Sequence, residues 1–211
     1  YPILSPQPGW AEQDPNVILS SVHQVIRNLV TESGIDSESI CGLSLSSVFH
    51  SLVAVDSHGR PVTPLIPWAD TRALPQAERL KSKVNKQEFY NRTGCPIHPM
   101  YLLPKLMWLR ENQQEAFARA SRFLSIKDFV IHDLTGQYVA DLSVASGSGL
   151  LNSRKCMWDE ESLEFAGITH LRLPELVPTD TVLEILPERR EALGLPKGAK
   201  LVVGAGDGVL A

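Results

Sequence analysis

Apolar residues recur at helical spacing in the first clear element of the chain. Between Asp14 and Gly34 they fall every three or four positions, which predicts an amphipathic helix. Asp14 is suited to cap this helix, Pro15 suits its first turn, and Gly34 is expected to stop it. We expect the helix to serve as scaffold, with a buried stripe made of Val17, Ile18, Val22, Val25, Ile26, Leu29 and Val30.

The later elements alternate between extended segments and segments with helical spacing. Extended segments are predicted at residues 40–48, 51–56, 62–68 and 122–126, with a turn at 57–60. Helical spacing is found at residues 72–84, 102–112 and 127–134, and short helices are expected at 159–166 and 187–194. Strands and helices in alternation indicate an α/β architecture, and no internal repeat is visible.

Small and polar residues dominate the segment from 143 to 149. Its run of Ser, Ala and Gly could be interpreted as a phosphate cradle. The segment has no Lys in the position that a P-loop requires. We therefore predict a surface loop there.

A last apolar run, at residues 201–203, leads into glycines that surround a carboxylate at Asp207. A buried strand that ends in this way would place Asp207 at its carboxyl end, where open α/β sheets bind their ligands. Without Cβ atoms, the glycines would let a substrate or phosphate approach the main chain. The alternative is an ordinary turn with a solvated Asp.

Composition narrows the class of protein. The chain has 211 residues, of which 43% are hydrophobic, enough for one large domain or two small ones. A net charge of -4 argues against a nucleic-acid partner, because phosphate backbones require clustered Lys and Arg. No run is long and apolar enough for a membrane span, and the start does not resemble a signal peptide, so we expect a cytoplasmic protein without a membrane partner.

The three cysteines, Cys41, Cys95 and Cys156, are widely spaced, and their odd number makes a disulfide framework improbable. We expect them to be small core residues. Cys95 and His98 have a metal-like spacing, but the second half of a tetrahedral zinc site is missing. The sequence assigns no metal ligands.

Two other stretches carry side chains that suit a sugar site. His50 follows the strand predicted at 40–48, and a histidine there can equally be structural. Trp68, Asp70 and Arg72 follow the extended segment at 62–68. An indole face with charged groups suits a polyol pocket, since the ring packs on C–H surface while the charges bind hydroxyls. The alternative is that Asp70 or Thr71 caps a helix while Trp68 covers the core.

Five stretches in the same order resemble the FGGY family of carbohydrate kinases, and the resemblance covers nearly the whole chain. Three of them are most similar to the gluconokinase branch of the family. The five are Pro8-Gly9-Trp10-Ala11-Glu12-Gln13-Asp14-Pro15, Ser46-Ser47-Val48-Phe49-His50-Ser51, Trp68-Ala69-Asp70-Thr71-Arg72, Thr93-Gly94-Cys95-Pro96-Ile97-His98-Pro99-Met100 and Gly204-Ala205-Gly206-Asp207-Gly208.

The resemblance implies a ribonuclease-H-like, actin-like ATPase domain with a mixed sheet flanked by helices. It implies transfer of phosphate from ATP, with Mg²⁺, to the terminal hydroxyl of gluconate, with Asp207 as general base. Gly206 and Gly208 would leave room for the nucleotide. Arg72 could hold the gluconate carboxylate as a bidentate partner. The remaining sugar-facing positions that it implies are Phe49, His50, Trp68, Asp70 and Met100.

One departure from the family pattern concerns the phosphate loop. Members begin with a strand that carries Asp-x-Gly-Thr or a similar sequence, and this chain contains none. We therefore expect residues 1–211 to be a partial amino-terminal, sugar-binding domain, without the opening strands and the ATP-side domain, and inactive alone. The strand at 40–48 should then expose an unpaired edge, covered by another chain or by residues outside this sequence.

Other functions remain open from the sequence. A pentulose kinase for xylulose or ribulose differs only in its substrate, which is also an open-chain polyol. A non-catalytic sugar-binding module is compatible with a sugar site that lacks the phosphate loop. A dinucleotide-binding domain fits less well, because the third glycine of its fingerprint would fall at Val209. Homodimerisation stays open too.

Overall fold

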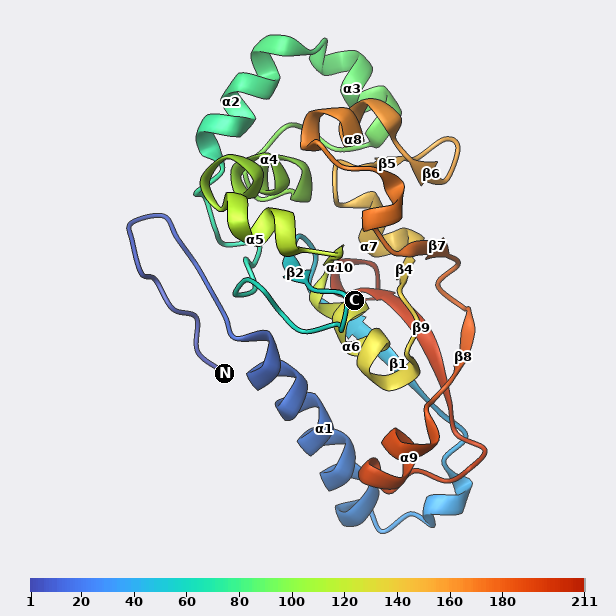
Figure 1. Ribbon diagram of the computed structural model, residues 1–211. Coiled ribbons are helices and arrows are strands. Elements are labelled where there is room, and N and C mark those ends of the chain that lie inside the picture. The colour runs from blue at the N-terminus through green and yellow to red at the C-terminus, as the bar shows by residue number, and fades with distance from the viewer. Residues whose placement is uncertain (211) are drawn as a thin grey trace.

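The strands of the molecule form four small sheets with helices packed around them (Figure 1). The computed structural model describes residues 1–210. The largest sheet has the order β1-β9-β8 and contains β1 (Gly42–Ser47), β8 (Val182–Glu184) and β9 (Lys200–Gly206). The other pairs are β2 (Val53–Val55) with β3 (Arg122–Leu124), β4 (Val139–Asp141) with β7 (Glu175–Val177), and β5 (Leu151–Asn152) with β6 (Met157–Trp158).

Helix α1 (Pro15–Glu32) confirms the predicted element but buries a narrower face than expected. The Asp14 side chain accepts a hydrogen bond from the Asn16 amide and caps the helix. Ile18 and Ile26 are buried, and Leu19, Val22 and Val30 are packed in part against the core. The expected stripe is wrong for Val17, Val25 and Leu29, which are 44%, 66% and 61% exposed. They lie on the flank that turns away from the core.

The other helices gather around the sheets. Figure 1 shows α2, α3, α4 and α8 at one end of the molecule, and α1 and α9 at the other. Their bounds are α2 (Leu74–Lys83), α3 (Lys86–Thr93), α4 (Leu102–Asn112), α5 (Gln114–Arg119), α6 (Ile126–Thr135), α7 (Leu142–Ser146), α8 (Glu160–Ala166), α9 (Pro187–Leu193) and α10 (Asp207–Leu210), with 3-10 turns at Ser37–Ser39 and His170–Arg172. Segment 62–68 forms isolated bridges, such as Leu52 with Ile66, instead of a regular strand.

Strand β1 occupies one edge of the three-stranded sheet. It pairs in parallel with β9, and within residues 1–210 no strand pairs with its other side. The register shifts between Ser44 and Ser46, so β9 holds one extra residue there. Gly204 lies in this bulge with φ +73°, and a Cβ at this position would overlap with the Leu45 carbonyl oxygen. The bulge therefore requires glycine.

The predicted surface loop at 143–149 is wrong. Residues 142–146 form helix α7, which Asp141 caps by accepting a hydrogen bond from the Val144 amide at 2.9 Å. Val144, Ala145 and Ser148 are buried. The residues are small because this segment packs closely on its neighbours: a Cβ on Gly147 would lie 2.8 Å from the Phe49 ring.

Two lysines are fully buried in the core. Lys127, on α6, pairs with Asp141 at 2.7 Å, and both side chains have no exposed surface. Lys105, on α4, is equally buried in the cluster that includes Leu52, Leu80 and Leu106. None of the helices in residues 1–210 has the length and apolar character needed to cross a membrane.

Candidate functional site

The candidate site lies where β1 and β9 end side by side. Parallel strands end at the same edge of a sheet, and here Ser47 pairs with Gly206 in the last register position. Phe49 and His50 follow β1, and Asp207 directly follows β9. The expected position of Asp207, at the carboxyl end of a strand, is confirmed.

The ring of Phe49 fills the space beside the glycines. A Cβ on Gly206 would overlap with this ring, and a Cβ on Gly147 would touch both Phe49 and His50. The absence of a side chain at Gly206 therefore makes room for the Phe49 ring. Gly208 is different, since a Cβ there would meet the Phe49 ring at an ordinary 3.7 Å.

His50 is held in an unusual backbone conformation with a defined ring orientation. Its φ is +62°, in the left-handed region. Its Nδ1 lies 2.6 Å from the Gly147 carbonyl oxygen, and because a carbonyl only accepts, Nδ1 must carry the proton. The pKa of His50 lies below its ordinary value, mainly because burial disfavours the charged ring. A neutral ring with this tautomer presents Nε2 as a hydrogen-bond acceptor.

Asp207 is an exposed carboxylate at the start of α10. Its Oδ1 accepts a hydrogen bond from the Gly208 amide at 2.8 Å, and the negative charge of Asp207 acts on the His50 ring by raising its pKa against the effect of burial. The Gly206 amide donates to Ser143 Oγ at 3.1 Å, which joins this end of β9 to α7. Asp207 thus lies at the strand end next to the one that leads to His50, close enough for its charge to act on the ring, and it keeps lone pairs for a substrate.

Trp68 and Met100, two of the expected sugar-facing residues, lie in two separate turns of the chain. Trp68 is 54% exposed, so it does not cover the core. Met100 is partly buried in the turn before α4, where its amide donates to His98 Nδ1 at 3.2 Å. The next residue, Tyr101, packs its ring edge-on against His50 with 4.8 Å between ring centroids. The turn before α4 is thereby fixed against the His50 ring.

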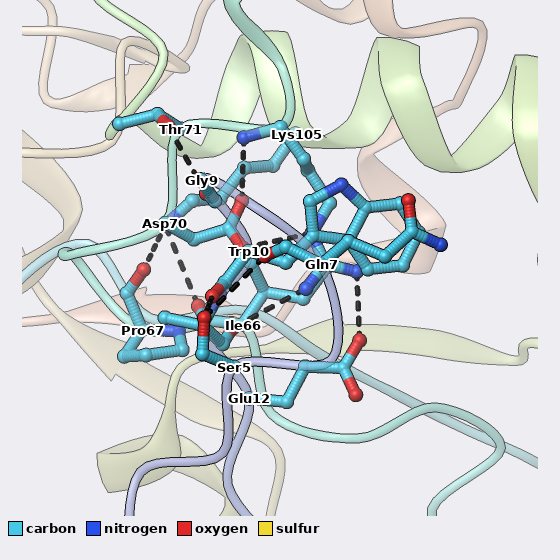
Figure 2. Close-up of polar contacts among 12 residues, drawn as sticks. Ser5, Gln7, Gly9, Trp10, Glu12, Ile66, Pro67, Asp70, Thr71 and Lys105 are labelled. Carbon is cyan, nitrogen blue, oxygen red and sulfur yellow. Dashed lines mark hydrogen bonds and ion pairs between the residues drawn. The ribbon is translucent and has the colours of Figure 1, made fainter.

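Asp70 and Arg72 form a buried network with the segment that precedes α1, and Figure 2 shows Asp70 near Trp10 of that segment. Asp70 has no exposed surface and accepts hydrogen bonds from the Ala11 amide at 2.7 Å and from Arg72 Nε at 2.8 Å. Arg72 also pairs with Glu12 at 2.9 Å, and its guanidinium stacks over Trp10 at 3.9 Å. Helix α2 begins only at Leu74, so Asp70 is not its cap.

This network changes the interpretation of both residues. The Arg72 side chain is 2% exposed and directs its donors at Asp70, Glu12 and the Ala11 carbonyl oxygen. It does not present a free fork to a substrate carboxylate, as the sequence had led us to expect. Asp70 is likewise saturated by protein donors. Both residues fasten segment 9–12 to the turn that carries Trp68.

The sequence reasoning missed Lys105, which lies directly behind the site. Its Nζ donates to the carbonyl oxygens of His50 at 2.5 Å, Pro67 at 2.8 Å and Ile66 at 3.4 Å. Burial lowers the pKa of Lys105 to about 7. One signal was available, because Lys105 is a lone charge among the apolar residues that run from Leu102 to Leu109.

No metal centre can be assigned to these residues. In residues 1–210, the His, Cys, Asp and Glu side chains form no group of three or more that could hold a metal ion. Mg²⁺ is commonly held by one or two carboxylates together with substrate phosphates and water, and Asp207 is the single carboxylate at this end of β9 among the described residues. Residues 1–210 therefore hold no preformed cluster of side chains for a metal ion.

Comparison with known proteins shows one family. The profile of the FGGY family of carbohydrate kinases, N-terminal domain, matches residues 1–211. The gluconokinase of Bacillus subtilis (strain 168) is 37% identical over 211 residues, which are 100% of this chain and 41% of that protein. The xylulose kinase of Lactococcus lactis is 30% identical over 212 residues, covering 100% of this chain and 42% of that protein.

Solved structures agree with the sequence relatives. The crystal structure of gluconate kinase from Lactobacillus acidophilus matches with a TM-score of 0.94 and 35% identity, over 100% of this chain and 42% of that one. A ligand-bound xylulose kinase from the same organism matches with the same TM-score, identity and coverage. The chain therefore has the mixed α/β fold of these N-terminal domains and spans about two fifths of the length of its relatives.

Proposed function

The chain belongs to the FGGY family of carbohydrate kinases, and we propose that the protein containing it phosphorylates the terminal hydroxyl of D-gluconate with ATP, giving 6-phosphogluconate. The observation that carries this proposal is the exposed Asp207 carboxylate beside a neutral His50 at the joint end of β1 and β9. The choice of gluconate rests on two gluconokinases that are 37% and 36% identical over the whole chain.

Residues 1–211 would supply the sugar half of the active site. The relatives are more than twice as long, and the part of their length that this chain does not match is where we place the ATP side. In this arrangement the nucleotide would approach the end of β9 from the open side of Gly208. The chain alone is then expected to bind sugar without transferring phosphate.

The reaction follows from the position of Asp207. Its carboxylate would accept the proton of the terminal hydroxyl while that oxygen forms a bond to the γ-phosphorus of ATP, and ADP leaves as the bond to its β-phosphate oxygen breaks. Phosphoryl transfer leaves the protein mainly positioning and charge stabilisation to perform. Mg²⁺ would neutralise phosphate oxygens when it is bound with ATP.

The sugar itself would be recognised by groups around Asp207. We propose that His50 Nε2 accepts a hydrogen bond from a sugar hydroxyl, since Nδ1 is committed to Gly147. The half-exposed Trp68 offers an indole face for C–H surface, and Phe49 and Met100 would border the pocket. With the Arg72 donors already engaged, the carboxylate of gluconate must find its partner elsewhere.

A pentulose kinase is the second candidate, and a specific observation favours it. A solved xylulose kinase matches this chain as well as the gluconate kinase does, with a TM-score of 0.94 and 35% identity. Both substrates are open-chain polyols, so the same Asp207 and His50 geometry serves either. The two candidates differ only in what must bind the acid group.

Coupled ADP-release assays on the full-length protein separate these candidates. We expect turnover of gluconate with ATP, and Asp207→Asn should reduce kcat by about a hundredfold or more with little change in the KM for sugar. Asp180→Asn, at another exposed aspartate, is the matched control and should leave both unchanged. Turnover of xylulose without turnover of gluconate would refute gluconate as the substrate. A near-normal kcat in Asp207→Asn would refute Asp207 as the general base.

A further inference from the structure

The ammonium group of Lys105 joins two stretches of chain that are far apart in sequence. Both stretches border the candidate site: residues 48–51, called here the His50 turn, and residues 67–70, called the Trp68 turn. An ammonium has three N–H donors, and Lys105 directs all of them at backbone carbonyls, those of His50, Ile66 and Pro67. Figure 2 shows Lys105 together with Ile66, Pro67 and Asp70.

Burying Lys105 in the core has a cost in free energy. Lys105 has no exposed surface and, within residues 1–210, no carboxylate in salt-bridge contact, whereas the other buried lysine, Lys127, pairs with Asp141 at 2.7 Å. Burying a charge without an ionic partner is unfavourable, and an apolar side chain of similar length would fill the same volume without that cost. The benefit of having Lys105 here must therefore lie in holding the backbone segments of the three carbonyls in fixed positions relative to one another.

Few other bonds connect the two turns. Next to His50, the chain segments are joined by a single bridge, in which the amides of Leu52 and Ile66 each donate to the other's carbonyl at 2.9 and 2.8 Å. Beyond this bridge, towards the site, the His50 carbonyl and the Pro67 carbonyl are connected through Lys105 Nζ. His50 additionally holds a left-handed backbone that other residues of the chain must maintain.

We propose that Lys105 is a positioning residue that sets the spacing between the His50 turn and the Trp68 turn, and with it the width of the sugar site. The claim that these turns contact sugar rests on the proposed function. The claim that Lys105 holds the two turns together does not depend on the proposed function. The two claims are therefore tested by separate measurements on the same full-length variants.

Hydrogen exchange in Lys105→Met tests the positioning role directly. Met keeps an unbranched chain but has no donor, so the three carbonyls lose their common partner. We expect exchange at the amides of Leu52, Ile66 and Asp70 to accelerate by about tenfold or more, while the amides within α6 stay as protected as before. Leu106→Met, a similar substitution one residue along the same buried helix, is the matched control and should leave these three amides unchanged.

Steady-state kinetics then test the consequence for the sugar. Misplaced binding groups should reduce kcat/KM for sugar by about tenfold to a hundredfold, mostly through KM, while the KM for ATP changes less than about twofold. A purely structural role would lower the apparent kcat in proportion to the amount of folded protein and leave both KM values unchanged. Lys105→Gln, which retains an N–H donor, should fall between the natural protein and Lys105→Met in both measurements and replaces it if Lys105→Met does not fold.

Each outcome has a distinct meaning. Unchanged exchange at Leu52, Ile66 and Asp70 in a folded variant would overturn the positioning role, whatever the substrate. Faster exchange with an unchanged KM for sugar would overturn the link between spacing and sugar binding. Absence of sugar kinase activity in the natural protein would instead refute the proposed function, and the exchange result would still decide the role of Lys105.

Discussion

Two aspartates border the same candidate site but have opposite environments, one buried and one exposed. Asp70, in the Trp68 turn, has no exposed surface and is surrounded by donors from Ala11 and Arg72. Asp207, at the end of β9, is exposed and receives one short-range hydrogen bond from Gly208. The first carboxylate is used to hold the protein together, and the second is left able to accept a proton.

The difference shows that a charged side chain near a site is not by itself a site residue. From residue types alone, Asp70 and Arg72 look more suited to binding a sugar acid than Asp207 does. Their burial reverses this interpretation, because each charge already has its partner inside the protein. Removing a buried partner should therefore affect stability, whereas removing the exposed carboxylate should affect chemistry.

The largest expected effect on stability comes from Asp70→Ala. The substitution leaves the Arg72 guanidinium buried with Glu12 as its remaining carboxylate, and it removes the acceptor of the Ala11 amide. Breaking a buried pair in this way should lower the free energy of unfolding by about 3–5 kcal/mol. Urea denaturation followed by circular dichroism measures it. Asp180→Ala is the control, and a loss below about 1 kcal/mol in Asp70→Ala would contradict the comparison.

An intermediate effect is expected from the pH dependence of Lys105. Its pKa is lowered from 10.5 to about 7 by burial, so between these values the unfolded chain binds more protons than the folded one. Stability must then rise with pH in this window, by up to about 1.4 kcal/mol per pH unit. The penalty is fully present below about pH 7.

Comparing Lys105→Met with the natural protein isolates this contribution, because the other titrating groups are common to both. From about pH 7 to about pH 9, the natural protein should gain about 2 kcal/mol of unfolding free energy relative to the variant. Urea denaturation at a series of pH values measures the difference. A constant difference across the range would show that the ammonium keeps its proton and that burial does not set its pKa.

The smallest expected effect on stability is that of Asp207→Asn. The side chain is exposed, and its one hydrogen bond within residues 1–210 comes from the neighbouring Gly208 amide, which can donate equally to an Asn oxygen. The free energy of unfolding should change by less than about 0.5 kcal/mol, although catalysis is expected to fall steeply. Thermal and urea unfolding of the same preparation used for kinetics measure this. A loss as large as that of Asp70→Ala would make Asp207 a structural residue.

Much of the fold could be predicted from the sequence where local signals agree. Helix α4 has the predicted bounds, 102–112, and the apolar residues that dominate it from Leu102 to Leu109 place it in the core. The family resemblance is confirmed by a match over the whole chain. Helix α3 was missed because its residues are mostly polar and only Phe89 and Thr93 are buried, although the Asn85 cap and the left-handed Gly94 mark its ends.

The candidate site was less predictable because it depends on contacts between distant segments. The role of Gly206 is decided by Phe49, which is 157 positions earlier in the chain. The Arg72 guanidinium is occupied by its contacts with Glu12 and Trp10. The ammonium group of Lys105 is satisfied in the core by carbonyls from two separate turns. Residue types predict which groups could act, but only packing determines which of them are free to do so.

The bulge at Gly204 decides which face of the sheet the residues at the end of β9 point to. Side chains of a strand alternate between the two faces of a sheet, so one additional residue exchanges the faces for everything that follows it. In β9 the residues that follow are those that lead to Asp207, opposite Ser46 and Ser47 of β1. The bulge absorbs this residue: regular pairing of the same sequence without a bulge would place Gly204 opposite Ser46 and Ala205 opposite Ser47, and Asp207 would leave the sheet from the other face.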